Sequence, residues 1–100
     1  MKLLVNYLPW YASWKGLLGT KSPKPLYFTT RFGIHTFGMQ YAIDVVILDN
    51  RKIMRKLKSD LSPNQFFFWN PLFSHVVELP SGTIKKNNFR IGKPLEIVIK

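Results

Sequence analysis

The sequence predicts a small, mainly β protein, either a β-barrel or a β-sandwich with one short N-terminal helix. Short runs rich in β-branched and aromatic residues recur along the chain, and turn residues separate them. Little of the sequence shows the helical spacing of apolar residues. Such strands are typical of sheets that close or stack on one another. At 100 residues, we expect one domain spanning residues 1–100.

The expected elements follow from the pattern of apolar residues. Residues 10–18 form the expected helix because their large apolar side chains recur at spacings of three and four. The run Ile43–Leu48 is apolar on both faces apart from Asp44, which is typical of a strand in the middle of a sheet. The other expected strands cover residues 3–8, 26–29, 33–38, 66–69, 74–79 and 95–99, and one helical turn covers residues 83–88.

The segment 52–58 fits either a strand or a helix. Asp49, Asn50 and Arg51 before it suit a tight hairpin, since Asn accepts left-handed backbone geometry, and we therefore favour the strand. A regular strand would place alternate side chains on one face, namely Lys52, Met54, Lys56 and Lys58.

The composition is basic and lacks cysteine. Lys and Arg number 15 against five Asp and Glu, which gives a net charge of +10. Such a charge attracts polyanions, and it also keeps a small aromatic-rich protein soluble. The absence of cysteine excludes disulfides, thiolate metal sites and thiol nucleophiles. A hydrophobic content of 46% argues against disorder.

The beginning of the chain resembles a secretory signal only in part. One lysine precedes a short apolar run, which Asn6 and Pro9 interrupt. The longest uncharged run, residues 61–77, contains prolines and amides and lacks the ~20 apolar residues of a membrane-spanning helix. We therefore expect a soluble, cytoplasmic protein.

The candidates for catalysis are polar residues within apolar strands. They are His35, Asp44 and Glu78, with His75 as an outlying fourth. A buried Asp44 would need a partner, and the structural interpretation is that backbone groups of the preceding loop, or His35, supply it. In the catalytic interpretation Asp44 orients His35 as a general acid or base.

A ligand pocket is the second use of the same residues. Glu78 alternates with Val77 and Leu79, so it faces either solvent or a cleft. If this face also receives His35, the residues could line a pocket for a small ligand or a protein partner. The predicted ligand-binding set is His35, Phe37, Met39, Asp44 and Glu78. No motif for a metal or cofactor occurs, and we expect neither.

The basic and aromatic residues give a third hypothesis. Lys52, Lys56 and Lys58 would form a row that suits phosphates, or else an edge strand charged against aggregation. The run Phe66–Trp69 cannot be buried entirely if it is extended. Exposed rings in small β proteins stack with the bases of single strands, and we expect Trp69 to do so.

Several blocks of residues resemble domain of unknown function family 192. They are Lys15–Gly19, Ile34–Met39, Ile43–Asp49 and Val77–Gly82, within a likeness that runs from about Trp14 to Val98. The resemblance implies a β-rich fold but no reaction, because the family has no established activity. Relatives often have Gly-Asp before the last strand, whereas this chain has Gly92-Lys93. Some relatives carry export signals.

Three functions are therefore open from the sequence. The first is a non-enzymatic accessory module that binds a ligand or partner through residues 32–39 and the strand end at Glu78. The second is a basic nucleic-acid-binding protein, whose affinity would fall steeply with salt. The third is a small enzyme that uses His35 with Asp44 or Glu78.

Overall fold

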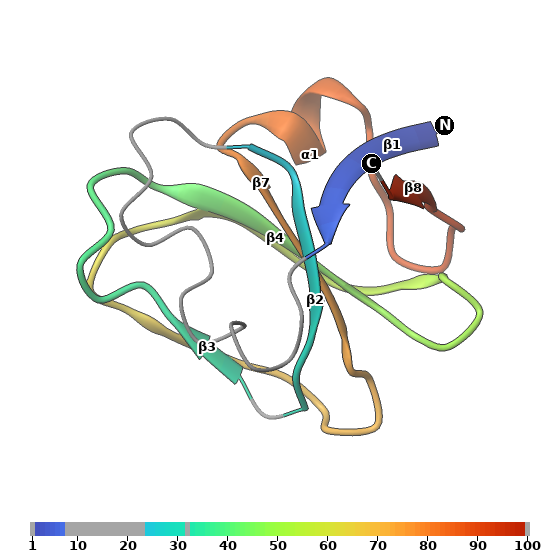
Figure 1. The fold of residues 1–100 in the computed structure, drawn as a ribbon, viewed down its shortest axis with the longest axis horizontal. Coiled ribbons are helices and arrows are strands. Elements are labelled where there is room, and N and C mark those ends of the chain that lie inside the picture. Colours follow the sequence, from blue (N-terminus) through green and yellow to red (C-terminus); the bar gives the residue numbers. More distant parts are fainter. Residues whose placement is uncertain (1, 8–23, 32, 100) are drawn as a thin grey trace.

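The computed structural model describes residues 2–7, 24–31 and 33–99. These residues form eight strands and one short helix (Figure 1). The predicted helix over residues 10–18 lies outside the described part of the chain. The strands are β1 (Lys2–Tyr7), β2 (Leu26–Thr29), β3 (Gly33–His35), β4 (Ile43–Leu48), β5 (Met54–Leu61), β6 (Phe66–Phe68), β7 (His75–Pro80) and β8 (Glu96–Ile99), and the helix is α1 (Thr83–Lys86).

The strands build one mixed sheet and one small ribbon. The six-stranded sheet has the order β5-β4-β7-β2-β1-β8, and β3 pairs with β6 in a separate two-stranded ribbon. Strand β1 runs parallel to both β2 and β8, and all the other pairs are antiparallel. The mainly β class is therefore confirmed. The described strands do not close into a barrel, however, because β5 and β8 remain edges of an open sheet.

Apolar side chains cover both faces of the sheet, and β4 shows why. Its side chains alternate between two clusters, with Val46 and Leu48 in one and Val45 and Ile47 in the other. All six residues of β4 are buried, as expected for a strand in the middle of a sheet.

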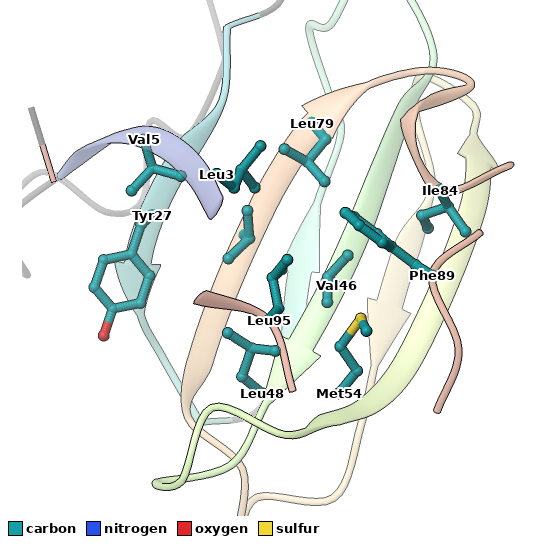
Figure 2. Packing of buried hydrophobic residues seen from close by; sticks show 11 residues of the cluster. Leu3, Val5, Tyr27, Val46, Leu48, Met54, Leu79, Ile84, Phe89 and Leu95 are labelled. Atoms are coloured by element: carbon teal, nitrogen blue, oxygen red, sulfur yellow. The ribbon is translucent and has the colours of Figure 1, made fainter. Parts of the chain in front are cut away.

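The first cluster fills the face that carries β1, α1 and the residues before β8 (Figure 2). Leu3 and Val5 enter it from β1, Ile84 from α1, and Phe89 and Leu95 from the segment that follows α1. We call this side of the sheet the helix face. Sequence-distant segments at the two ends of the described chain thus share one core.

The second cluster lies between the sheet and the β3–β6 ribbon. Phe67 and Ile34 reach it from the ribbon, Phe28 from β2 and Val76 from β7. Phe67 and Ile34 are partners in the ribbon's register, so the ribbon covers this side of the sheet with one of its own faces. We call this side the ribbon face, and the ribbon's other face is directed outward.

Strand β5 confirms the predicted hairpin and the choice of a strand over a helix. Its pairing with β4 contains register shifts between Ile43 and Val45 and between Ile47 and Leu48. These irregularities break the simple alternation, so Met54 is buried although Lys56 is exposed. Lys52 precedes the strand and has a positive φ of 64°. The predicted row of Lys52, Met54, Lys56 and Lys58 on one face is therefore wrong.

The described residues have the overall size of a single compact domain. The Cα radius of gyration is 12.1 Å, close to the ~13 Å expected for a domain of 100 residues. No helix among the described residues is long and apolar enough to cross a membrane.

Candidate aromatic binding surface

The two carboxylates predicted to take part in a site do not meet. Asp44 is opposite Leu79 in the β4–β7 register, and Glu78 is opposite Val45. Leu79 belongs to the cluster on the helix face and Val45 to the cluster on the ribbon face. Because cross-strand partners point to the same side, Asp44 enters the helix face and Glu78 the ribbon face.

Asp44 is fully buried and is held by backbone donors. Its Oδ1 accepts a hydrogen bond from the Asp60 N–H at 3.0 Å, and its Oδ2 accepts one from the Ile84 N–H at 2.8 Å. The backbone role agrees with the structural interpretation, but the donors lie on β5 and α1 rather than in the loop before β4. The carboxylate thereby ties β4 to β5 and to the start of α1, which is an architectural role.

Glu78 and Met39 are also buried, with 3% and 8% of their surfaces exposed. The expectation that Glu78 faces solvent or an open cleft is corrected, because both faces of the sheet are covered at this position. Met39 is part of the apolar cluster on the ribbon face. Neither side chain presents a surface to a ligand in this structure.

His35 differs from these residues because it is exposed. Its ring stacks on that of Phe37, with centroids 5.2 Å apart and an interplanar angle of 25°. The two side chains share a face, as predicted, but the predicted strand over residues 33–38 ends at His35 and Phe37 lies in the turn that follows. No described hydrogen bond joins His35 to Asp44, so the structure provides no support for an acid–base pair between them.

Two further rings extend this stack along the outward face of the ribbon. Phe37 meets Phe66 edge to face with centroids 4.8 Å apart, and Phe66 stacks on Phe68 at 5.7 Å. Phe66 and Phe68 are 59% and 61% exposed, and Phe37 is 42% exposed. We call the surface formed by His35, Phe37, Phe66 and Phe68 the aromatic ladder.

Gly33 allows one end of the ladder to lie flat on the ribbon. Gly33 is opposite Phe68 in the register. A Cβ at position 33 would come within 2.6 Å of Phe68 Cδ1 and 2.7 Å of the Phe67 carbonyl oxygen. The Phe68 ring therefore occupies the space that any other residue at position 33 would fill.

Thr36 fixes the turn that carries Phe37. Its buried hydroxyl donates to the Ser62 carbonyl at 2.6 Å and accepts from the Gln65 N–H at 2.9 Å. Its N–H donates to the Gln65 carbonyl at 2.9 Å, and its carbonyl accepts from the Asn64 N–H at 3.0 Å. These bonds hold the turn after β3 against the loop before β6, so Phe37 and Phe66 are positioned by a rigid frame.

A lysine lies at the margin of the ladder. Lys56 Nζ donates to the Phe68 carbonyl at 2.9 Å and stands 5.0 Å from the centroid of the Phe67 ring. Lys58 follows it on the same side of β5, because Lys56 and Lys58 are opposite Ile47 and Val45 in the register. Lys52 is elsewhere, with its ammonium beside His75 and Tyr27.

Trp69, the ring predicted to stack with bases, is buried instead. Only 6% of its surface is exposed, and its indole N–H donates to the Phe73 carbonyl at 2.6 Å. Phe67 and Trp69 point inward in the four-aromatic run, which leaves Phe66 and Phe68 outside. The exposed rings of this run are therefore Phe66 and Phe68 rather than Trp69, and they lie beside His35 and Phe37 of the predicted ligand-binding set.

The ladder is suited to stacking with planar groups. Exposed ring faces bind other π systems without needing directed hydrogen bonds. The described residues contain no cluster of His, Asp or Glu that could hold a metal ion.

Comparisons with known proteins show the fold alone. No family model matches the chain, and no curated protein matches it. A protein of unknown function from Novosphingobium aromaticivorans is similar, with a TM-score of 0.78, 10% identity, and coverage of 88% of this chain and 70% of its own. A proposed transcription regulator from Sinorhizobium meliloti has a TM-score of 0.76 and 15% identity, and the match covers 88% of this chain and 76% of the other.

Proposed function

We propose that this protein is a non-enzymatic module that binds single-stranded nucleic acid on the aromatic ladder. The observation that carries the proposal is the continuous row of four rings in contact on the outward face of the ribbon, with two stacked pairs joined by one edge-to-face contact. Phe66 and Phe68 are more than half exposed, and a contiguous exposed apolar patch of this kind marks an interaction surface. Successive bases of a single strand can stack on such rings whatever their sequence.

The charge of the chain supports a polyanionic partner over an apolar one. The net charge is +10, and the Lys56 ammonium donates a hydrogen bond to the backbone carbonyl of Phe68. Lys58 adds a second cation on the same side of β5. Bases on the rings would bring backbone phosphates towards these lysines, and their binding would release counterions.

The first hypothesis from the sequence is retained in part. Residues 33–39 supply His35 and Phe37 to the proposed surface, whereas the buried Glu78 does not belong to it. The resemblance to domain of unknown function family 192 remains a proposal that rests on the residue blocks described above.

The test is binding of a fluorescent DNA single strand of about ten nucleotides, measured by anisotropy. Each base stacked on a ring contributes about 1–3 kcal/mol, so Phe66→Ala and Phe68→Ala should each raise the Kd by roughly 5- to 150-fold. Ile91→Ala is the control, because it removes an equally exposed apolar side chain from the segment after α1. The wild-type Kd should also rise steeply with salt.

Two results would overturn this function. One is the finding that Phe66→Ala and Phe68→Ala bind the DNA single strand with the same Kd as the control Ile91→Ala. The other is the absence of binding at low salt by a protein whose circular dichroism and unfolding transition show that it is folded.

A further inference from the structure

Four polar side chains from four segments meet on the helix face of the sheet, far from the ladder. Tyr7 comes from β1, Tyr27 from β2, Lys52 from the β4–β5 hairpin and His75 from the start of β7. The rings of Tyr7 and Tyr27 lie 5.8 Å apart, and those of Tyr27 and His75 stack at 5.9 Å. Figure 2 shows Tyr27 at the margin of the apolar cluster with its hydroxyl directed away from it.

Hydrogen bonds define the state of His75. Its Nε2 lies 3.1 Å from Asn50 Oδ1, which can only accept, so Nε2 carries the proton. Its Nδ1 is then the acceptor for the Tyr27 hydroxyl at 2.6 Å. Burial, and next the ammonium of Lys52, hold the pKa of His75 below its usual value, against a smaller opposing effect of Asp49. The imidazole is therefore neutral near pH 7.

Lys52 is half-buried among groups that carry no negative charge. Its Nζ lies 3.4 Å from His75 Nδ1 and 5.5 Å from the centroid of the Tyr27 ring. The nearby Asp49 accepts bonds from the Arg51 and Ile53 N–H groups and from Arg55 Nε, and Arg55–Asp49 is the one ion pair among the described residues.

The backbone at Lys52 adds a second observation. Its φ is 64°, in the left-handed region that residues with a side chain adopt mainly in turns, as Asn64 and Asn88 do here. The neighbouring Asn50 is tied to His75, and the Lys52 carbonyl accepts from the Leu95 N–H at 2.9 Å. The hairpin is thus held in the position that places the Lys52 ammonium over Tyr27.

We propose that Lys52 and Tyr7 form the binding site for a phosphate group, with Tyr27 and His75 as the positioning residues beneath it. The Lys52 ammonium offers hydrogen-bond donors and a positive charge, and the Tyr7 hydroxyl offers one more donor, whereas the Tyr27 hydroxyl already donates to His75. Tyr7 is 47% exposed, so the site is open to solvent on that side. A phosphate would supply the negative charge that the described neighbours of Lys52 lack.

This site does not depend on the function proposed for the ladder. Tyr27 belongs to the cluster on the helix face. Phe67 belongs to the cluster on the ribbon face, and its sequence neighbours Phe66 and Phe68 are part of the ladder. The sheet separates the two. The phosphate could belong to a nucleic-acid strand or to a small phosphorylated ligand, and both present the same group to Lys52.

The experiment is a titration of the folded protein with inorganic phosphate at constant ionic strength, followed through the ring nitrogens of His75 by NMR. We expect a saturable shift and a rise in the pKa of His75, because the phosphate offsets the charge of Lys52. Lys52→Gln should raise the Kd at least tenfold, and Lys52→Arg should restore most of the affinity. Lys85→Gln, which removes an exposed lysine of α1, should leave the Kd within about twofold.

Three outcomes decide the proposal. Shifts that rise linearly without saturation, or that are equal in Lys52→Gln and Lys85→Gln, would overturn it. Saturation by inorganic phosphate alone supports it and assigns the site to a small ligand. Saturation by a DNA single strand in the Phe66→Ala variant supports it and assigns the site to a nucleic-acid phosphate. Loss of strand binding to the ladder would leave the phosphate titration unchanged, so the two proposals fail separately.

Discussion

Asp44 and Glu78 lie on neighbouring strands of one sheet, and their side chains enter opposite faces. Asp44 is the partner of Leu79 across the β4–β7 pair, and Glu78 is the partner of Val45. Leu79 and Val45 belong to the two different clusters. The two carboxylates therefore cannot line the same ligand pocket, and the ladder contains neither of them.

The first prediction concerns the buried carboxylate of Asp44. Asp44→Asn keeps the volume but replaces one of the two accepting oxygens with an amide that donates. One backbone N–H, of Asp60 or of Ile84, then loses its acceptor. We expect the free energy of unfolding to fall by about 1–3 kcal/mol, measured by urea denaturation.

The matched control for Asp44 is Asp60→Asn, because the Asp60 side chain is exposed and bonds to the Ser81 hydroxyl. It should change stability by less than about 0.5 kcal/mol. If Asp44→Asn is as mild as this control, the carboxylate does not tie β4 to α1.

The second prediction is a pH dependence that belongs to His75. Its pKa in the folded protein is below the ordinary value of 6.5. The unfolded chain therefore binds a proton more readily, and stability falls as the pH drops below about 6.5 towards the folded pKa. The slope contributed by this residue is at most about 1.4 kcal/mol per pH unit.

Denaturation between pH about 7.5 and about 5.5 measures this slope. The His75→Gln variant should lose the contribution, whereas His35→Gln changes an exposed histidine and should keep it. Wild type and His75→Gln with the same slope would show that His75 is not shielded as described.

The third prediction tests the contact of Gly33 with the ladder. Gly33→Ala brings a Cβ against the Phe67 carbonyl and the Phe68 ring. We expect a loss of about 1–3 kcal/mol in the free energy of unfolding, because the Phe67 carbonyl is part of the ribbon and cannot move freely. Gly92→Ala serves as a comparison, since a Cβ there meets nothing and the cost comes only from the positive φ of 92°.

An NMR spectrum of Gly33→Ala should also show shifted Phe68 ring resonances, because the Phe68 ring can move away from the new Cβ more easily than the Phe67 carbonyl can. Unchanged Phe68 signals together with unchanged stability would refute the close packing of ring and glycine.

The fourth prediction separates the core aromatic from the surface ones. Trp69→Phe removes the indole N–H that bonds to the Phe73 carbonyl. Stability should fall by about 1–3 kcal/mol, while the Kd for a DNA single strand changes less than about twofold. If Trp69→Phe lowered the affinity for the strand more than Phe66→Ala does, Trp69 would have to be part of the binding surface.

Local patterns were sufficient for much of the fold. The bounds of β2 and β4 agree with the predicted runs 26–29 and 43–48, because continuous apolar and β-branched residues leave few alternatives. The hairpin at Asp49–Arg51 was also predictable from its turn residues. The existence of strand β5 was predictable. Which of its side chains point to each face of the sheet was not, because the register shifts depend on pairing with β4.

The site was less accessible to sequence reasoning. In a strand of four consecutive aromatic residues, either alternate pair could point towards the core. Phe67 and Trp69 are the pair that does so, in the cluster that also contains Ile43 and Val76. The group around His75 was missed because Tyr7, Tyr27 and Lys52 come from distant parts of the sequence and follow no common spacing. A useful signal was Lys52, two residues after Asn50 in a tight turn, because a lysine there places a cation beside the neighbouring strand.

The parallel pairing of β1 with β8 has a consequence for synthesis of the chain. Residues 2–5 find their partners only at residues 96–99, and the cluster on the helix face also needs Phe89 and Leu95. A growing chain on the ribosome therefore exposes Leu3 and Val5 until nearly all of these 100 residues have been made. We expect folding to wait for that moment and to be slow for a domain of this size, because its pairings are mostly distant in sequence.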